Sequence, residues 1–192
     1  MNLIKQIVDE KKYDTDKIIH GYHEAYCFHF DKIREKVSNI LEIGVHKGGS
    51  LEMWKDYFPN AQIIGIDIID QRYTPSSPRI KVEFGDATKQ DVVNNLINKY
   101  GKFDIVIDDG SHWSSHMKKS FKLLYPHTNL IYVVEDMATQ KSGFRKDVYI
   151  DERPTMMEEM LKLTEHAIDY PNGAAEFKSI SFHKWQCYIY KK

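Results

Sequence analysis

The chain of 192 residues has few cysteines and no long apolar segment. Cys27 and Cys187 are its two cysteines, which excludes a disulfide framework and a zinc site built on clustered thiolates. No apolar run reaches the roughly 18 residues that a membrane-spanning helix needs. Residues 1–10 also lack the apolar core of a signal peptide. These absences predict a cytoplasmic protein in a reducing compartment, without contact to a membrane.

A strong net charge of either sign is also missing. The formal net charge is -1 and the isoelectric point is near 6.8, so no basic field attracts a nucleic acid. A small molecule or a glycan is therefore the favoured partner. With 42% hydrophobic residues the chain can bury one core. We predict a single domain over 1–192, with an N-terminal helical cap or lid over 1–37 and a nucleotide-binding core over 38–192.

The sequence of residues 39–50 predicts a strand followed by a glycine turn. Its apolar run is too short for a helix, and the glycines after it permit a tight turn. Ser50 is placed to cap the helix that follows. A strand, a glycine turn and a helix N-terminus in this order form a nucleotide-binding corner, because free backbone N–H groups face the ligand. The residues are Ile40, Leu41, Ile43 and Val45 in the strand, and Gly44, Gly48 and Gly49 in the turn.

The spacing of the glycines indicates which nucleotide binds. A dinucleotide fingerprint reads G-x-G-x-x-G, but His46 stands two positions after Gly44, which argues against a pyrophosphate on this turn. Glu42 places a carboxylate where a cation such as the ammonium of S-adenosylmethionine is welcome. Asp67 ends the next predicted strand, 62–67, where an acid can accept both hydroxyls of a ribose. A structural strand and turn in another α/β protein is the alternative.

The remaining pattern alternates strands with helices. Such alternation predicts a parallel sheet covered on both faces, and a final hairpin closes it in the antiparallel sense. Residues 137–151 are predicted as a loop over the site. The predicted strands are 79–84, 102–108 and 129–136, the hairpin strands are 176–182 and 185–190, and the predicted helices are 1–12, 24–37, 50–58, 90–100, 114–125 and 155–168.

Pairs of acids end two of these strands. If the strand over 129–136 lies beside the one over 102–108, Asp109, Glu135 and Asp136 converge at one edge of the sheet. Carboxylate oxygens suit Mg²⁺ or Ca²⁺, and without a neighbouring cysteine zinc is not expected. Some of these acids can instead cap helices or bind adenosine, and Asp108 is assigned to the cofactor. His112, beside this edge, suits a general base, although lone histidines are often structural.

Four motifs together resemble a known family: E-x-G-x-x-x-G-G-S at 42–50, D-D-G-S-H at 108–112, E-D at 135–136 and D-K-x-x-H-G-Y-H-E-x-Y at 16–26. They are similar to the metal-dependent sugar O-methyltransferases, class I S-adenosylmethionine-dependent enzymes that act on macrolide deoxysugars and on rhamnose units of glycans. The resemblance covers residues 14–136. It implies a Rossmann-like class I methyltransferase fold, a mostly parallel seven-stranded sheet with a C-terminal antiparallel hairpin.

The resemblance also implies a transferase of sugar O-methylation in glycan biosynthesis, which uses S-adenosyl-L-methionine and Mg²⁺. In the family an acid at the place of Asp86 meets the adenine amino group, whereas on its own it suits a helix cap equally well. The implied site residues are Glu42, Gly44, Gly48, Ser50, Asp67 and Asp86 for the cofactor, Asp109, Glu135 and Asp136 for the metal, His112 with Asp109 for catalysis, and Tyr22 and His23 beside the substrate.

Two other functions stay open from the sequence. One is methylation of a catechol-like small molecule, which uses the same cation. The other is a non-catalytic nucleotide-binding domain of a larger glycan-synthesis protein. The oligomeric state is open as well, a homo-oligomer included.

Overall fold

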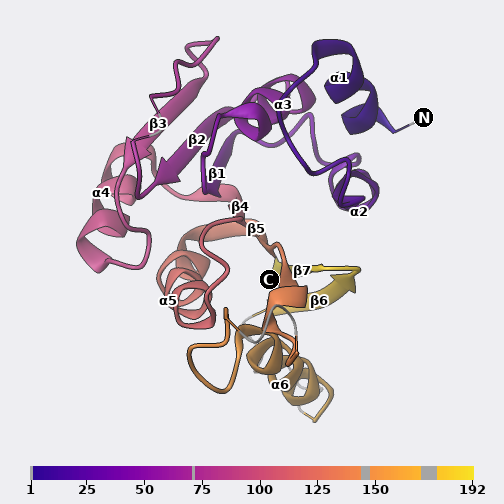
Figure 1. The fold of residues 1–192 in the computed structure, drawn as a ribbon, viewed down its shortest axis with the longest axis vertical. Coiled ribbons are helices and arrows are strands. Elements are labelled where there is room, and N and C mark those ends of the chain that lie inside the picture. The colour runs from indigo at the N-terminus through magenta and orange to yellow at the C-terminus, as the bar shows by residue number, and fades with distance from the viewer. Residues whose placement is uncertain (1, 71, 144–147, 170–176) are drawn as a thin grey trace. The chain divides into compact units, whose positions relative to one another are not determined.

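The computed structural model describes residues 2–70, 72–143, 148–169 and 177–192 (Figure 1). The chain divides into two compact units, Met1–Ala87 and Thr88–Lys192, called here the N-terminal unit and the C-terminal unit. The segment predicted as a cap, 1–37, belongs to the N-terminal unit together with core strands. The single domain over 1–192 stays a prediction.

The N-terminal unit contains a parallel sheet of three strands in the order β3-β2-β1. The strands pair in register, with Leu41 opposite Ile64 and Ile64 opposite Lys81. The first two strands are apolar and buried, which is typical of parallel strands covered on both faces. The elements of this unit are α1 (Leu3–Lys11), α2 (Tyr22–Phe30), β1 (Asn39–Ile43), α3 (Gly49–Tyr57), β2 (Gln62–Asp67) and β3 (Ile80–Phe84).

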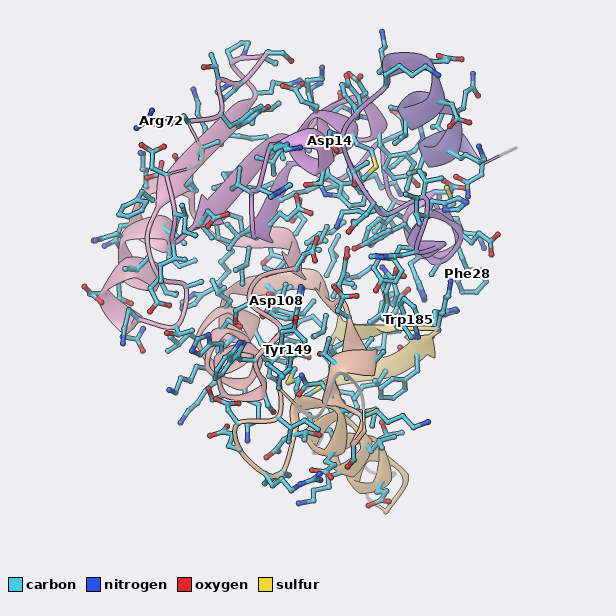
Figure 2. The ribbon with its side chains drawn as sticks, in the orientation of Figure 1. Asp14, Phe28, Arg72, Asp108, Tyr149 and Trp185 are labelled. Atoms are coloured by element: carbon cyan, nitrogen blue, oxygen red, sulfur yellow. The ribbon has the colours of Figure 1, made fainter. Side chains whose placement is uncertain are left out.

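Aromatic side chains pack α2 against α3. The rings of Tyr26 and Trp54 lie 4.8 Å apart edge to face, and those of Phe30 and Phe58 lie 5.5 Å apart. The helix predicted over 24–37 begins earlier and ends at Phe30. Phe28 does not share the buried side of Phe30, because residues two apart point to nearly opposite sides of a helix. Phe28 is 73% exposed, whereas Phe30 is fully buried. Phe28 is labelled in Figure 2.

The C-terminal unit contains four strands in the order β4-β5-β7-β6. β4 and β5 are parallel neighbours, and β7 is antiparallel to both β5 and β6, so the predicted hairpin is confirmed. The region predicted as a loop, 137–151, contains the short helix η2, and its residues 144–147 lie outside the described ones. The elements are α4 (Gln90–Tyr100), β4 (Phe103–Asp108), α5 (Ser114–Leu124), η1 (Tyr125–His127), β5 (Thr128–Val134), η2 (Met137–Gln140), α6 (Met156–Asp169), β6 (Phe177–His183) and β7 (Gln186–Lys191).

The predicted fold class is confirmed. The strands are mostly parallel and alternate with helices, and a C-terminal antiparallel hairpin completes the set. Among the described residues, no helix combines the length and the apolar character that crossing a bilayer requires.

Candidate functional site

The glycine turn between β1 and α3 is held by Asp67 at the end of β2. One carboxylate oxygen, Oδ2, accepts the N–H groups of Val45 at 2.9 Å and of His46 at 3.2 Å. The other, Oδ1, accepts the N–H of Ile69 at 2.9 Å. A carboxylate has about four acceptor positions, so one is left for a ribose hydroxyl. The structure thus gives Asp67 a role in shaping the turn, and its contact with a ribose stays a prediction.

Two of the turn's glycines are closely approached by other parts of the chain. A Cβ atom at Gly48 would lie 2.4 Å from the ring of Tyr73, and one at Gly49 would lie 2.0 Å from the backbone oxygen of Asp14. Real Cβ atoms essentially never come within 3.0 Å of such atoms, so a side chain at Gly48 would displace the ring of Tyr73 and one at Gly49 would displace the backbone of Asp14. Direct contact of Gly44 and Gly48 with a cofactor stays a prediction.

Replacing Gly48 by alanine is expected to destabilise the protein more than replacing Gly143. Both glycines have a positive φ, +78° and +88°, which costs an alanine about 1–2 kcal/mol. A Cβ at Gly143 meets nothing within 4 Å, whereas one at Gly48 must displace Tyr73. Urea unfolding of the two variants measures the difference. A Tyr73→Ala background should remove the excess cost of Gly48→Ala; an unchanged excess would contradict the packing argument.

Glu42 lies fully buried next to the last residue of β1, between a hydroxyl and an ammonium group. Ser50 donates its hydroxyl to Glu42 Oε2 at 2.6 Å, and Lys17 Nζ lies 3.2 Å from Oε1. The prediction that Ser50 caps α3 was wrong. The N-cap position is Gly48, and Ser50 lies in the first turn of the helix, where its hydroxyl binds Glu42. The sequence predicted a cation beside Glu42, and in the structure Lys17 supplies one. Cofactor contacts of Glu42 and Ser50 stay predictions.

Lys17 was missed by the sequence analysis as a residue of the site. It belongs to the D-K-x-x-H-G-Y motif that carried the resemblance, but lysines are mostly exposed and nothing in the neighbouring residues signals burial. The motif was the only available signal.

The other predicted residues of the N-terminal unit are Tyr22, His23 and Asp86. Tyr22 and His23 begin α2 and are both buried, and the ring atom Nδ1 of His23 has no hydrogen-bond partner in the described part of the chain. Their role toward a substrate stays a prediction. Asp86 does not cap α4, whose N-cap position is Lys89. The adenine contact implied by the resemblance therefore stays as its predicted role.

The acidic residues of the C-terminal unit follow β4 and β5, which are parallel neighbours. One ligand atom from each of Asp109, His112 and Asp136 lies within 4.8 Å of the other two, and all three residues are partly exposed. These three residues are called the acidic cluster. Glu135 is not among them and its side chain is buried. The structure thus brings two of the three predicted metal ligands together with the predicted base, and the role of Glu135 stays a prediction.

The two carboxylates of the acidic cluster suit a small hard cation, because carboxylate oxygens are the ligands that Mg²⁺ prefers. One oxygen of Asp109 and one of Asp136 lie within 4.8 Å of each other, close enough for both side chains to approach one ion. His112 Nε2 lies beside them, 3.3 Å from Asp136 Oδ2.

Strained backbone positions hold this cluster. His112 and Asp136 have φ values of +61° and +54°, a left-handed conformation that histidine and aspartate adopt more readily than most residues. Gln140 of η2 donates its side-chain N–H to the carbonyl of His112 at 2.8 Å, and Thr139 donates its hydroxyl to the carbonyl of Asp136 at 2.7 Å. Strain of this kind persists where surrounding contacts fix it, often at functional sites.

Thr139 and Gln140 are residues that the sequence analysis missed. They stand in a polar stretch with no periodicity, and only the path of η2 shows that they reach back to His112. The start of η2 is fixed by the N–H of Met137, which donates to the carbonyl of Trp185 at 2.7 Å. Trp185 is labelled in Figure 2.

Asp108, predicted as a cofactor ligand, is buried at the end of β4 (Figure 2). Its Oδ2 accepts the hydroxyl of Ser120 from α5 and that of Tyr132 from β5, the latter at 3.2 Å. Burial raises the pKa of Asp108, against the opposing effect of the Ser120 hydrogen bond, and it raises the pKa of Tyr132 as well. These contacts give Asp108 a structural role that joins β4, β5 and α5. Its contact with a cofactor stays a prediction.

Asp108→Asn is expected to flatten the pH dependence of stability. An acid whose pKa rises on folding holds its proton more tightly in the folded state, so its contribution is present below the ordinary pKa of 3.8 and is lost as pH rises through the folded-state value. Asparagine keeps the acceptor oxygen but does not ionise. Urea unfolding from about pH 4 upward, with chelator present, measures the free energy of unfolding, which should fall less with rising pH in the variant than in the wild type. Asp91→Asn, in an exposed position of α4, is the control and should keep the wild-type slope.

Comparison with known proteins identifies the relatives of this chain. No protein-family model matches it. It is 41% identical over 139 residues to mycinamicin VI 2″-O-methyltransferase of Micromonospora griseorubida, a match that covers 67% of this chain and 35% of that protein. It is 35% identical over 167 residues to 8-demethyl-8-alpha-L-rhamnosyl tetracenomycin-C 2′-O-methyltransferase of Streptomyces olivaceus, covering 81% and 44%. The chain is a homologue of sugar O-methyltransferases.

A solved structure agrees with this homology. The MycE methyltransferase in complex with Mg, SAH and mycinamycin VI superposes with a TM-score of 0.83 at 30% identity, covering 98% of this chain and 53% of that one. The resemblance inferred from the motifs and the methyltransferase fold are thereby confirmed. This methyltransferase homologue spans less than half the length of the two curated relatives.

Proposed function

We propose that this chain carries the catalytic site of an S-adenosylmethionine-dependent O-methyltransferase that acts on a sugar hydroxyl. The acceptor is a rhamnose-like deoxyhexose of a glycan or of a glycosylated metabolite. The observation that carries the proposal is the acidic cluster, Asp109, His112 and Asp136, formed where two parallel strands end in a homologue of sugar O-methyltransferases. The names of those relatives favour a sugar over a catechol as the acceptor.

The turn proposed to bind the cofactor lies in the N-terminal unit. This glycine turn is shaped by Asp67 and leads into α3, whose first N–H groups can face the cofactor. MycE, to which the chain is similar, is described in complex with SAH, the demethylated form of this cofactor. The proposed cofactor residues are those predicted from the sequence: Glu42, Gly44, Gly48, Ser50, Asp67, Asp86 and Asp108.

The residues proposed to bind the metal lie in the C-terminal unit. Asp109 and Asp136 would hold Mg²⁺ or another hard divalent cation, and Glu135 is the third ligand predicted from the sequence. When bound there, such a cation supplies Lewis-acid polarisation of the acceptor hydroxyl. The backbone contacts of Thr139 and Gln140 keep the carboxylate of Asp136 and the ring of His112 in place for it.

His112 serves as the general base rather than as a ligand. A histidine that binds a metal ordinarily donates its second ring N–H to a partner. In the described part of the chain, Nδ1 of His112 has no hydrogen-bond partner. The other ring atom, Nε2, lies 3.3 Å from Asp136 Oδ2, on the side of the two aspartates. Nε2 takes the proton of the acceptor hydroxyl, and the Asp136 carboxylate stabilises the imidazolium that forms.

Intact-mass detection of methyl transfer tests the proposed function. The protein is incubated with S-adenosylmethionine, Mg²⁺ and a panel of rhamnosylated acceptors, and the product should gain one CH₂ group. Acceptors that lack the neighbouring hydroxyl should lose most of the rate, because a vicinal diol offers one oxygen for anchoring while the other is deprotonated. Calorimetry should show binding of S-adenosylmethionine and not of NAD. Methylation of catechols alone, or NAD binding alone, would overturn the proposal.

A further inference from the structure

Lys17 is a lysine whose side chain is fully buried in the N-terminal unit. Lysines are almost never fully buried unless they are paired, because removing the ammonium from water is costly. Nothing in the proposed reaction uses this cation. Its burial therefore needs another explanation, which its surroundings provide.

The Lys17 ammonium joins three elements of the unit. It lies 3.2 Å from Glu42 Oε1 on β1, and 6.0 Å from the ring centroids of Tyr26 on α2 and Trp54 on α3. Ion pairing and cation–π attraction both strengthen where water is excluded. The partner Glu42 holds in addition the hydroxyl of Ser50, in the first turn of α3. A continuous chain of polar contacts thus runs from Lys17 through β1 to the start of α3.

The segment that carries Lys17 crosses the glycine turn. The backbone oxygen of Asp14, a residue of this segment, fills the space where a Cβ of Gly49 would stand. Asp14 is labelled in Figure 2. Tyr13 donates its hydroxyl to Asp56 of α3 at 2.6 Å, and Asp14 pairs with Lys47 of the turn at 2.9 Å. The pair with Lys47 is exposed and therefore weak. The pair of Lys17 and Glu42 is buried, so it fixes this segment more strongly than the exposed pair does.

We propose that Lys17 is a positioning residue for the cofactor-binding turn, acting through its buried ion pair with Glu42. Glu42 precedes the turn and Ser50 follows it, so their contact sets the distance between the strand and the helix that the turn connects. The Lys17 ammonium, 3.2 Å from Oε1, orients the Glu42 carboxylate for this contact. Glu42 consequently acts on the cofactor through the backbone of the turn. This inference rests on the proposed function.

Removing the Lys17 ammonium alone should weaken SAH binding more than removing both charges of the Lys17–Glu42 pair. Without Lys17 the buried carboxylate of Glu42 loses the ammonium that offsets its charge, and breaking one side of a buried ion pair in this way is strongly destabilising. With glutamine in place of Glu42 that penalty disappears, and the amide oxygen can still accept the hydroxyl of Ser50. A direct contact of Glu42 with the cofactor predicts the opposite, since the double variant would then keep the full loss of Glu42→Gln.

The test is a double-mutant cycle on SAH binding, measured by calorimetry on the full chain. Lys17→Met should raise the dissociation constant at least about tenfold, and Lys17→Met/Glu42→Gln should bind more tightly than Lys17→Met. Lys5→Met is the matched control: this lysine is exposed on α1, paired with Asp9, and its loss should leave binding unchanged.

Three outcomes decide the matter. If Lys17→Met lowers the melting temperature but binds SAH as the wild type does below it, the role is structural only and the inference is overturned. If the losses of SAH-binding free energy in Lys17→Met and Glu42→Gln add up in the double variant, Lys17 and Glu42 act independently. That result overturns the inference as well. Failure of the wild type to bind SAH contradicts the proposed function instead, which separates the two failures.

Discussion

Replacing His112 by asparagine is expected to lower the turnover number by roughly 10²- to 10⁴-fold, the usual contribution of a general base. The dissociation constant of S-adenosylmethionine should change little, because His112 acts on the acceptor proton. Asparagine is the appropriate substitution, since His112 has φ = +61° and asparagine adopts this left-handed conformation readily. Steady-state kinetics with a rhamnosylated acceptor and calorimetry with the cofactor give the two quantities.

The neighbouring His116 supplies the control for this experiment. It lies on α5, is exposed, and its ring nitrogen Nδ1 is 2.8 Å from the hydroxyl of Ser111. His116→Asn should retain the wild-type turnover number. His112→Ala should lose additional stability compared with His112→Asn, because alanine tolerates the positive φ less well. Full turnover of His112→Asn at every pH tested would remove this residue from the mechanism.

Replacing Asp109 or Asp136 by asparagine is expected to abolish activation by Mg²⁺ and to reduce turnover at least about 100-fold. Loss of Lewis-acid stabilisation is worth several kcal/mol, and each 1.4 kcal/mol is about tenfold in rate. A chelator should produce the same loss in the wild type, with recovery when Mg²⁺ is added. Asparagine also keeps the left-handed backbone of Asp136, whose φ is +54°.

Two further variants sharpen the metal experiment. Asp91→Asn removes an exposed carboxylate of α4 and should leave the Mg²⁺ titration unchanged. Glu135→Gln tests the third ligand predicted from the sequence, which the structure buries outside the acidic cluster. A loss equal to that of Asp109→Asn assigns Glu135 to the metal, and a small loss leaves the two aspartates as its protein ligands. Undiminished turnover of Asp109→Asn with chelator present would rule out a metal at this place.

The secondary structure was readable from the sequence where local patterns are strong. The predicted strand 62–67 has the bounds of β2, and the helix 90–100 has those of α4. Apolar periodicity and turn residues decide such elements locally, because they reflect which side chains the element must bury. The helix predicted over 24–37 was too long, because α2 ends at Phe30.

The types of residue at the site were also readable, since acids that end parallel strands gather at one edge of a sheet. Their contacts were not. The sequence placed Ser50 as a cap, whereas the structure engages it with Glu42. The contacts of Asp67 with the backbone of the turn were not predicted, and its contact with a ribose stays a prediction. Side-chain hydrogen bonds depend on distances between elements, which a pattern along one element does not contain.

By itself the sequence determined the order of strands and helices, the glycine turn and the positions of the acids, because each depends on residues adjacent in the chain. Only the tertiary structure decided that Lys17 is buried against Glu42, 25 positions later along the chain, and that Gln140 holds the carbonyl of His112 across 28 positions. Contacts of this kind arise when distant segments fold onto one another, and their free energy depends on burial that no local pattern records.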